Sequence, residues 1–410
     1  MIRWIITIII LGIIDFYAFQ AFKTISKSKA TGYIYIIVSV IVLGYLFYQI
    51  TYADRSGALN TKMNLAIGLF LTFYIPKLVL VIVMFGEDLI RIPQALFHYF
   101  FQDSTSRIFY FPSRRVFISK IGVILAAIPF SAFLYGMFKG RYNFKVLNYK
   151  MYFEDLPEAF DGYRITQISD IHIGSFDNKE KLEYAIDLIN EQASDTILFT
   201  GDLVNNRADE MIRWKDSFTK LKARDGLFSI LGNHDYGDYT RWETEELKKL
   251  NFQNLINIQK EIGFDLLLNE SRFIEKDNQR IAIIGVENWG KGFKQKGDLK
   301  KASEIIDPKD FKILLSHDPS HWEYQVVDDE YHYHLTLSGH THGMQFGIEI
   351  PGLIKWSPVK WRYKYWAGIY EKNKQFINVN RGFGVLAYPG RVGIWPEITV
   401  IELKKGQQPA

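Results

Sequence analysis

Residues 165–172 read ITQISDIH, an apolar run that ends in an aspartate and a histidine two positions apart. The run has the length and composition of a buried β-strand, so Asp170 and His172 follow directly after a strand end. Four more apolar runs, at 196–200, 227–231, 312–316 and 335–338, precede Gly201-Asp202, Gly232-Asn233-His234-Asp235, His317 and Gly339-His340-Thr341-His342. Because strand ends in an α/β sheet meet at one edge, we expect these polar side chains to converge.

The residue types in these motifs indicate a pair of metal ions. Imidazoles, carboxylates and one amide oxygen, in a chain without cysteine, suit manganese first, with iron or zinc as alternatives. Two such ions, about 3.5 to 4 Å apart, can clamp a phosphoryl group, and Asp202 is the natural bridge between them. A lone histidine such as His317, or a Gly-Asp pair, is by itself more often structural. The prediction therefore rests on five motifs in order.

Taken together, the motifs D-x-H, G-D, G-N-H-D, H and G-H-x-H resemble the signature of the calcineurin-like metallophosphoesterases over roughly residues 163–403. The resemblance implies an α/β fold, a four-layer sandwich of two mixed sheets flanked by helices. It also implies two divalent metal ions. The implied ligands are Asp170, His172, Asp202 and His342 for the first ion, and Asp202, Asn233, His317 and His340 for the second.

The same resemblance implies that His234 is a catalytic acid outside the metal coordination, because an imidazole can protonate a leaving alkoxide near neutral pH. Asp235 or another carboxylate is expected to orient it. Departures from the family pattern are Asn205 and Asn206 after the Gly-Asp pair, and Met344 in place of a frequent glycine. Neither departure removes a ligand. The remaining histidines, His98, His321, His332 and His334, lie outside the motifs and are expected to be structural.

The first 140 residues form a different physical class from the catalytic domain expected at 141–405. Four apolar stretches, at about 2–22, 31–53, 63–86 and 120–138, can each cross a hydrocarbon core that requires about 20 residues. A secretory signal could explain the first stretch, but it lacks a basic n-region and a small-residue cleavage site, so we expect a retained anchor. Asp15 should face a neighbouring helix or the interface, because a carboxylate facing lipid is costly.

Two further segments combine aromatic and basic residues. Residues 87–115 lie between the third and fourth expected helices, where they suit the headgroup level better than an ordinary solvated loop. Residues 355–366 read KWSPVKWRYKYW and follow the last ligand motif. This segment fits a surface for anionic headgroups. It fits equally well a β-hairpin with one aromatic core face and one basic solvent face.

These features predict a multi-pass protein of the cell (inner) membrane that hydrolyses a phosphodiester or pyrophosphate. Within the family, the chain resembles the membrane-associated branch that contains UDP-2,3-diacylglucosamine pyrophosphatases and exported phosphodiesterases. A lipid-linked substrate, such as a UDP-diacylglucosamine-type lipid A precursor, is the leading interpretation. Soluble nucleotides or phosphoproteins are alternative substrates, and a noncatalytic membrane scaffold is a third possibility. The net charge of +4 does not imply nucleic-acid binding, and near-equal numbers of basic residues on the two sides leave the orientation undecided.

Overall fold

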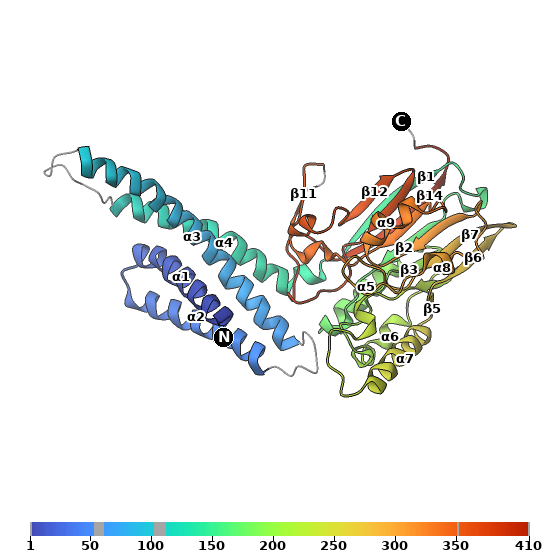
Figure 1. Cartoon of the computed structure of the whole chain (residues 1–410), viewed down its shortest axis with the longest axis horizontal. Coiled ribbons are helices and arrows are strands. Elements are labelled where there is room, and N and C mark those ends of the chain that lie inside the picture. Colours follow the sequence, from blue (N-terminus) through green and yellow to red (C-terminus); the bar gives the residue numbers. More distant parts are fainter. Residues whose placement is uncertain (1, 53–60, 102–111, 351, 409–410) are drawn as a thin grey trace. The chain divides into compact units, whose positions relative to one another are not determined.

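The structure is a computed structural model that describes residues 2–52, 61–101, 112–350 and 352–408. It divides into a helical unit that ends at Phe138 and an α/β unit that begins at Lys139 (Figure 1). The helical unit contains α1 (Ile2–Ile25), α2 (Lys29–Tyr52), α3 (Thr61–Phe101) and α4 (Pro112–Phe138). All four helices are long and apolar enough to cross a membrane, which confirms this part of the expected fold class.

Helix α3 is longer than the sequence suggested. Its expected end was residue 86, but it continues to Phe101. The acidic residues Glu87 and Asp88 suggested a helix end. Both are instead paired within the helical unit, because Arg115 donates hydrogen bonds to Glu87 and, at 2.9 Å, to Asp88. Residues 87–101 are therefore helical and not a loop. Four members of the aromatic and basic segment, Arg107, Phe109, Tyr110 and Phe111, lie outside the described residues.

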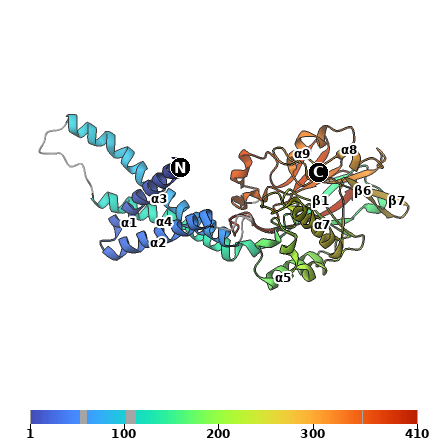
Figure 2. The same ribbon diagram turned by 60° about the horizontal axis from the view of Figure 1, so that its bottom comes forward.

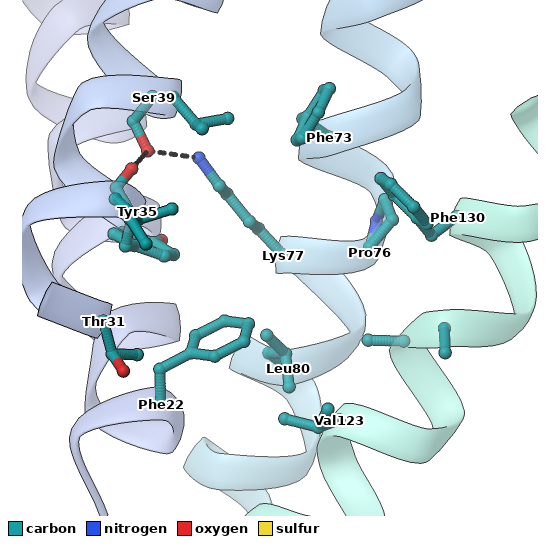
Figure 3. Close-up of a pocket in the computed structure, with 14 residues that line it drawn as sticks. Phe22, Thr31, Tyr35, Ser39, Phe73, Pro76, Lys77, Leu80, Val123 and Phe130 are labelled. Carbon is teal, nitrogen blue, oxygen red and sulfur yellow. Dashed lines mark hydrogen bonds between the residues drawn. The ribbon is translucent and has the colours of Figure 1, made fainter. Parts of the chain in front are cut away.

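Asp15 is paired inside the helical unit, as expected. Lys77 of α3 donates hydrogen bonds to Asp15 Oδ1 at 2.6 Å and to Ser39 Oγ at 2.8 Å, while Tyr74 and Tyr35 also donate to the Asp15 carboxylate. Lys77 and Ser39 face a cavity of about 410 Å³ among the four helices (Figure 3). The rest of its lining is mainly apolar. The ion pair between Asp15 and Lys77, with its hydrogen bonds from two tyrosines, keeps both charges away from the lipid-facing surface.

The α/β unit contains two six-stranded sheets and one separate hairpin. The first sheet has the order β1-β14-β2-β3-β4-β5, the second has the order β12-β13-β9-β8-β7-β6, and β10 pairs only with β11. The first sheet comprises β1 (Lys145–Phe153), β2 (Arg164–Ile168), β3 (Thr196–Phe199), β4 (Leu227–Ser229), β5 (Phe264–Leu266) and β14 (Glu397–Lys405). The second comprises β6 (Glu270–Lys276), β7 (Gln279–Gly285), β8 (Phe311–Leu315), β9 (Leu335–Ser338), β12 (Gly368–Lys372) and β13 (Gln375–Val379). The hairpin is β10 (Ile348–Ile350) and β11 (Ile354–Trp356).

Both sheets are mixed. In the first, β2, β3, β4 and β5 run parallel while β14 is antiparallel to β2. In the second, β7, β8, β9 and β13 run parallel while β6 and β12 are antiparallel at the two edges. Parallel strands in one sheet bring their carboxyl ends to one edge, where the predicted ligand motifs begin.

Alternating side chains divide the core of this unit into layers. Leu198 of β3 packs with Ile281 and Ile313 of the second sheet, whereas its neighbours Ile197 and Phe199 pack under α5 (Lys179–Asn190). Buried strands with apolar residues on both faces need cover on both sides. The short helices α8 (Leu299–Ala302) and α9 (Pro319–Tyr324) contribute to the core on the outer face of the second sheet. Figure 2 shows α5 and the pair α8 and α9 on opposite sides of the sheets.

Two further helices, α6 (Lys215–Phe218) and α7 (Glu245–Glu261), lie on the α5 side, where Phe218 and Leu255 join the same apolar cluster. The resulting order of helices, sheet, sheet and helices confirms the predicted sandwich of two mixed sheets. Helix α5 has a side-chain cap at its first turn, since the Asn178 side chain accepts a hydrogen bond from the backbone N–H of Lys181 at 2.9 Å.

Candidate metal centre

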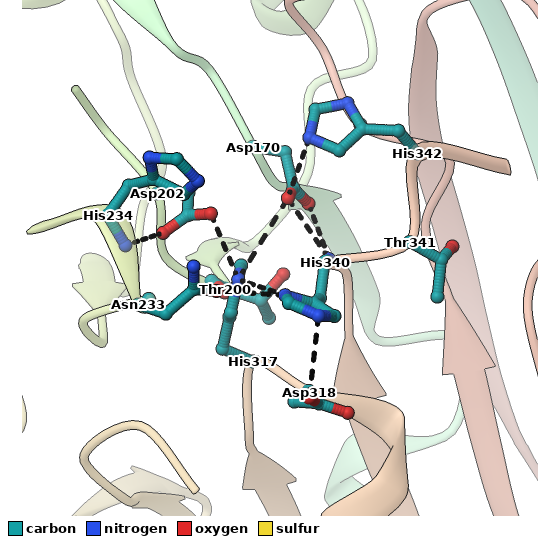
Figure 4. A network of polar contacts seen from close by, with 12 residues as sticks. Asp170, Thr200, Asp202, Asn233, His234, His317, Asp318, His340, Thr341 and His342 are labelled. Carbon is teal, nitrogen blue, oxygen red and sulfur yellow. Dashed lines mark hydrogen bonds and ion pairs between the residues drawn. The ribbon is translucent and has the colours of Figure 1, made fainter. Parts of the chain in front are cut away.

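The ligand motifs lie just beyond the carboxyl ends of five strands from both sheets. Asp170 follows β2, Asp202 follows β3 and Asn233 follows β4, all in the first sheet. His317 follows β8 and His340 follows β9, in the second. The two sheets thus present polar side chains to one shared site, as the sequence predicted (Figure 4).

Two groups of three buried or half-buried side chains have the spacing of metal sites. Asp170, His172 and His342 form one group, and Asp202, His317 and His340 form the other. Within each group, one potential ligand atom from each residue lies within 4.8 Å of the others. Asn233 joins the second group because its Oδ1 lies 2.8 Å from Nδ1 of His340. Each proposed ligand therefore lies next to the partners that the family resemblance implied for it.

One carboxylate oxygen connects the two groups. Asp202 Oδ2 lies 3.1 Å from Nε2 of His317 in its own group and 3.6 Å from Nε2 of His172 in the other. The second oxygen, Oδ1, accepts a hydrogen bond from the backbone N–H of His234 at 2.8 Å. The side chain is thus held by the backbone while its other oxygen faces both groups, which is the position that a bridging ligand needs.

The histidines are held so that the other ring nitrogen faces the site. His317 Nδ1 donates to the carbonyl of Thr200 at 2.7 Å, which leaves Nε2 toward Asp202. His340 has the opposite orientation. Its Nε2 lies 2.8 Å from the Tyr363 hydroxyl and 3.4 Å from Asp318 Oδ2, which leaves Nδ1 toward Asn233 and His317. Such partners fix the ring tautomer and raise the basicity of a metal ligand.

The charges in the site suit a cation. Burial would raise the pKa of Asp202, but the charges of His317 and His234 lower it well below its ordinary value. Burial would lower the pKa of His317, but the carboxylates of Asp202 and Asp170 raise it to about 10. Among the described residues, the ion-pair partners of the two aspartates are histidines and not lysine or arginine. The carboxylates therefore favour positive charge in the site, and divalent cations would supply it when the imidazoles give up their protons to bind metal.

Several of the proposed ligands have a strained backbone conformation. The non-glycine residues with positive φ include Asp170 (52°), His172 (44°), Asp202 (61°), His340 (70°) and His342 (51°). The left-handed region is unfavourable for L-residues and persists where the surrounding structure imposes it, often at functional sites. Five of the six residues in the two groups above thus have positive φ, and His317 is the exception.

The glycines of the motifs allow this close approach. A Cβ on Gly232 would lie 2.2 Å from Oδ1 of Asp202, and a Cβ on Gly339 would lie 2.2 Å from Oδ2 of Asp170. Any side chain at either position would push a carboxylate out of the site. The two glycines are therefore required by the space around Asp202 and Asp170.

Sequence comparisons agree with this geometry. A family model described as calcineurin-like phosphoesterase matches residues 163–344, and one described as probable calcineurin-like phosphoesterase, transmembrane domain, matches residues 2–141. An uncharacterized metallophosphoesterase of Bacillus subtilis, YkuE, is 33% identical over 61% of this chain and 82% of its own length. The chain belongs to the calcineurin-like metallophosphoesterases.

Two relatives extend the similarity into membrane proteins and along the whole chain. A transmembrane protein with metallophosphoesterase domain from Danio rerio is 26% identical over 66% of this chain and 60% of its own length. An uncharacterized metallophosphoesterase of Helicobacter pylori is 24% identical over 98% of this chain and 97% of its own length. The chain is thus a metal-dependent phosphoester hydrolase with an amino-terminal transmembrane region, in a family that uses a dinuclear metal centre.

The position of His234 in this metallophosphoesterase favours contact with substrate. Its Nδ1 donates to the carbonyl of Asn205 at 2.7 Å, and its half-buried ring lies beside the rings of His172 and Tyr239. This arrangement leaves Nε2 as the atom that a substrate would meet. The role of His234 as an acid stays a prediction.

The expected orienting role of Asp235 is wrong. Its buried carboxylate accepts hydrogen bonds from backbone N–H groups of Asp202 at 2.9 Å, Leu203 at 2.8 Å and Gly232 at 2.9 Å. Burial and the charge of Asp202 raise the pKa of Asp235 to about 7. Asp235 therefore holds the two ligand-bearing loops together, and a backbone carbonyl orients His234 in its place.

Three residues that support the site were not predicted from the sequence. Asp318 and Tyr363 orient His340, and adjacency to His317 was the only sequence signal for Asp318. Arg391 is fully buried and donates to the carbonyls of Arg381, Gly382 and Gly384. Gly384 N–H in turn donates to the Asp170 carbonyl at 2.9 Å. No motif surrounds Arg391, because its partners are backbone carbonyls and, at 3.4 Å, Nδ1 of His342, which lies 49 residues earlier in the chain.

A pocket of about 320 Å³ opens beside His340. Its lining includes Met344, Val359, Trp361, Arg362 and Tyr363. Met344 occupies the position where the family frequently has glycine, and it keeps the left-handed backbone with φ of 56°. The departure noted in the sequence thus places an exposed apolar side chain at the mouth of the pocket.

The segment 355–366 is not the expected β-hairpin, because β11 ends at Trp356 and a 3-10 turn at 358–361 follows. Three of its aromatic residues nevertheless face inward as that alternative required, whereas Trp361 is 75% exposed. Tyr363, Tyr365 and Trp366 are buried, whereas Lys360, Arg362 and Lys364 are exposed. A basic solvent face is thus present beside the pocket. The structural role expected for His321 and His334 agrees with their burial and their hydrogen bonds to Ser316 and Asp155.

Proposed function

We propose that the chain is a membrane-anchored dinuclear phosphohydrolase that cleaves a phosphodiester or pyrophosphate of a lipid-linked substrate in the cell membrane. The observation that carries the proposal is the single Asp202 oxygen that lies 3.1 Å and 3.6 Å from histidine nitrogens of two separate ligand groups. This arrangement supports two ions that share one carboxylate. Manganese is the proposed metal because imidazole and carboxylate ligands without thiolate suit it.

Bound at these residues, two divalent ions would supply Lewis-acid activation of the phosphoryl group and of an attacking water. The side chains of the two groups would hold them, with Asn233 completing the second. His234 would contribute the proton. Its Nδ1–H stays bonded to the Asn205 carbonyl, so Nε2 can carry a proton toward the leaving oxygen.

The pocket beside His340 supports a substrate that has both an anionic and an apolar part. Arg362 offers a guanidinium suited to a second phosphate or another anionic group. Met344 and Trp361 line the same pocket with large apolar surfaces. A lipid-linked phosphodiester or pyrophosphate, such as a UDP-diacylglucosamine-type lipid A precursor, has both features, and the transmembrane region would keep the enzyme where such substrates occur.

A direct test uses the purified full chain, loaded with Mn²⁺ and incubated with membrane lipid extracts. Phosphorus-containing species are followed by mass spectrometry, with soluble nucleotides and phosphoproteins in parallel reactions. The matched control is Asp202→Asn, which keeps the side-chain volume and removes the charge of the proposed bridge. Loss of one phospholipid class with the unsubstituted chain alone supports the proposal. Turnover of soluble phosphates alone favours the alternative substrates, and metal binding without any turnover favours the scaffold.

A further inference from the structure

The hairpin formed by 348–350 and 354–356 stands apart from both large sheets. Its register pairs Ile348 with Trp356, Glu349 with Lys355, and Ile350 with Ile354. Directly opposed residues in an antiparallel pair lie on the same face, and successive residues alternate between faces. One face of the hairpin is therefore apolar and the other carries Glu349 and Lys355.

The polar face is the one bound to the rest of the domain. The buried Arg381 donates two hydrogen bonds to the Glu349 carboxylate, at 2.9 Å and 2.5 Å. Lys355 donates to the carbonyl of Ala367, and its Nζ lies 5.0 Å from the Tyr370 ring centroid. Both charged side chains thus anchor the hairpin to the domain. This arrangement is the reverse of an ordinary surface hairpin, which buries its apolar face.

The apolar face of the hairpin is exposed to solvent. Ile348, Ile350 and Ile354 are exposed, and Leu353 between the two strands is 74% exposed. Within the described part of 139–408, six of the thirteen exposed large apolar side chains lie between 344 and 361. The other two of the six, Met344 and Trp361, line the pocket beside His340. This gathering of exposed apolar side chains in one short stretch of the chain indicates an interaction site.

The charges around this surface favour an anionic bilayer over other occupants. Lys360, Arg362 and Lys364 are exposed in the segment that follows the hairpin. Glu349 is the only acidic residue from 344 to 364, and it forms an ion pair with Arg381, which also pairs with the buried Glu397. In the part of the chain that the structure describes, none of the three exposed basic residues forms an ion pair, and apolar side chains flanked by such lysine and arginine residues suit the boundary between acyl chains and anionic headgroups. The transmembrane helices keep the domain near such a surface.

We propose that the hairpin inserts its apolar face into the lipid headgroup region and so seats the metal centre on the membrane surface. The inference rests on the proposed function, because it assigns the hairpin the task of bringing a lipid phosphate to that site. Trp361 lines the pocket beside His340, and its ring centroid lies 6.1 Å from that of Trp356 in the hairpin, so the hairpin adjoins the pocket.

Insertion can be measured on the full chain in nanodiscs that contain phosphatidylglycerol. The chain has no cysteine, so Leu353→Cys gives one attachment point for an environment-sensitive fluorophore. Ile212→Cys is the matched control, since Ile212 is 72% exposed and lies outside the hairpin. Doxyl-labelled lipids should quench the fluorophore at 353 at least several-fold more than the fluorophore at 212. Equal quenching at both positions would overturn the proposal.

Activity provides a second readout. The double variant Ile350→Ser/Leu353→Ser should lower kcat/KM for a p-nitrophenyl ester of phosphatidic acid in vesicles by about tenfold or more, since loss of one inserted leucine is worth about a decade. Hydrolysis of bis(p-nitrophenyl) phosphate in solution should not change. The control variant Ile212→Ser/Ile305→Ser should retain activity on both substrates.

The results of these experiments distinguish a failure of membrane insertion from a failure of the proposed hydrolytic function. If the unsubstituted chain hydrolyses neither substrate, the proposed function fails, while lipid quenching at 353 still decides insertion. A fluorophore at 353 that becomes buried without lipid quenching, together with a doubled particle mass, would identify a second copy of the chain as the occupant and overturn the proposal. Equal loss on both substrates in the hairpin variant would also overturn it, because the hairpin would then support the metal site.

Discussion

His234→Ala should separate catalysis from metal binding. The structure shows why the metal site should survive: the hydrogen bond from this residue to Asp202 Oδ1 comes from the backbone N–H, at 2.8 Å, and alanine retains it. Only the imidazole is lost, together with its bond to the Asn205 carbonyl. A positioned proton donor contributes about 10² to 10⁴-fold in rate. At about 1.4 kcal/mol for each tenfold change, the barrier should rise by about 3 to 5 kcal/mol.

The assay compares two leaving groups on the same full chain. An alkyl phosphodiester needs its leaving oxygen protonated and should show the full loss in kcat. An aryl phosphodiester with a nitrophenolate leaving group needs little protonation and should lose much less. Metal content, measured by inductively coupled plasma mass spectrometry, should stay at the unsubstituted value.

A matched control is His332→Ala, which removes an exposed imidazole outside the site and should leave both rates unchanged. Equal losses for the alkyl and aryl substrates would contradict a role as proton donor. Loss of bound metal in His234→Ala would show that this imidazole is a ligand, and the reasoning from the Asn205 contact would then be wrong.

Three further substitutions test the geometry around the site and in the membrane. Gly232→Ala places a Cβ 2.2 Å from Asp202 Oδ1, so metal content should fall and the free energy of unfolding should drop by about 1 to 3 kcal/mol in thermal denaturation. Met344→Gly relieves a left-handed φ of 56°, so stability should rise by about 1 kcal/mol while KM for a lipid substrate increases through the lost apolar contact. Lys77→Met leaves the Asp15 carboxylate unpaired and should destabilise the protein in detergent micelles by about 3 to 5 kcal/mol, whereas the double variant with Asp15→Asn should recover most of the loss.

The residue types of the site followed from the sequence because their signal is local. Each ligand motif follows an apolar strand, and parallel strands bring their carboxyl ends to one edge, so the order of motifs was enough to predict that the side chains converge, whereas their division into two groups came from the resemblance. The four membrane helices could likewise be predicted from the sequence, since length and apolar composition are properties of a contiguous stretch. The resemblance added the layered fold, which strand alternation alone would not specify.

Hydrogen-bond partners, by contrast, were decided by the tertiary structure. Asp235 looked like a partner for the adjacent His234, but its carboxylate turns to the backbone of Asp202 and Leu203, because those buried N–H groups have no strand partner. Helix α3 extends through Glu87 because Arg115 of another helix neutralises it. A charged residue in the sequence does not reveal which residue from another part of the chain will form an ion pair with it.

The hairpin of β10 and β11 shows the same limit most clearly. Alternation in IEI and IKW specifies that one face is apolar and the other charged, and that much is local. Which face points inward depends on Arg381 and on the Ala367 carbonyl, and both lie in other parts of the chain. Periodicity fixes the two faces of an element, but only long-range packing decides which face is covered.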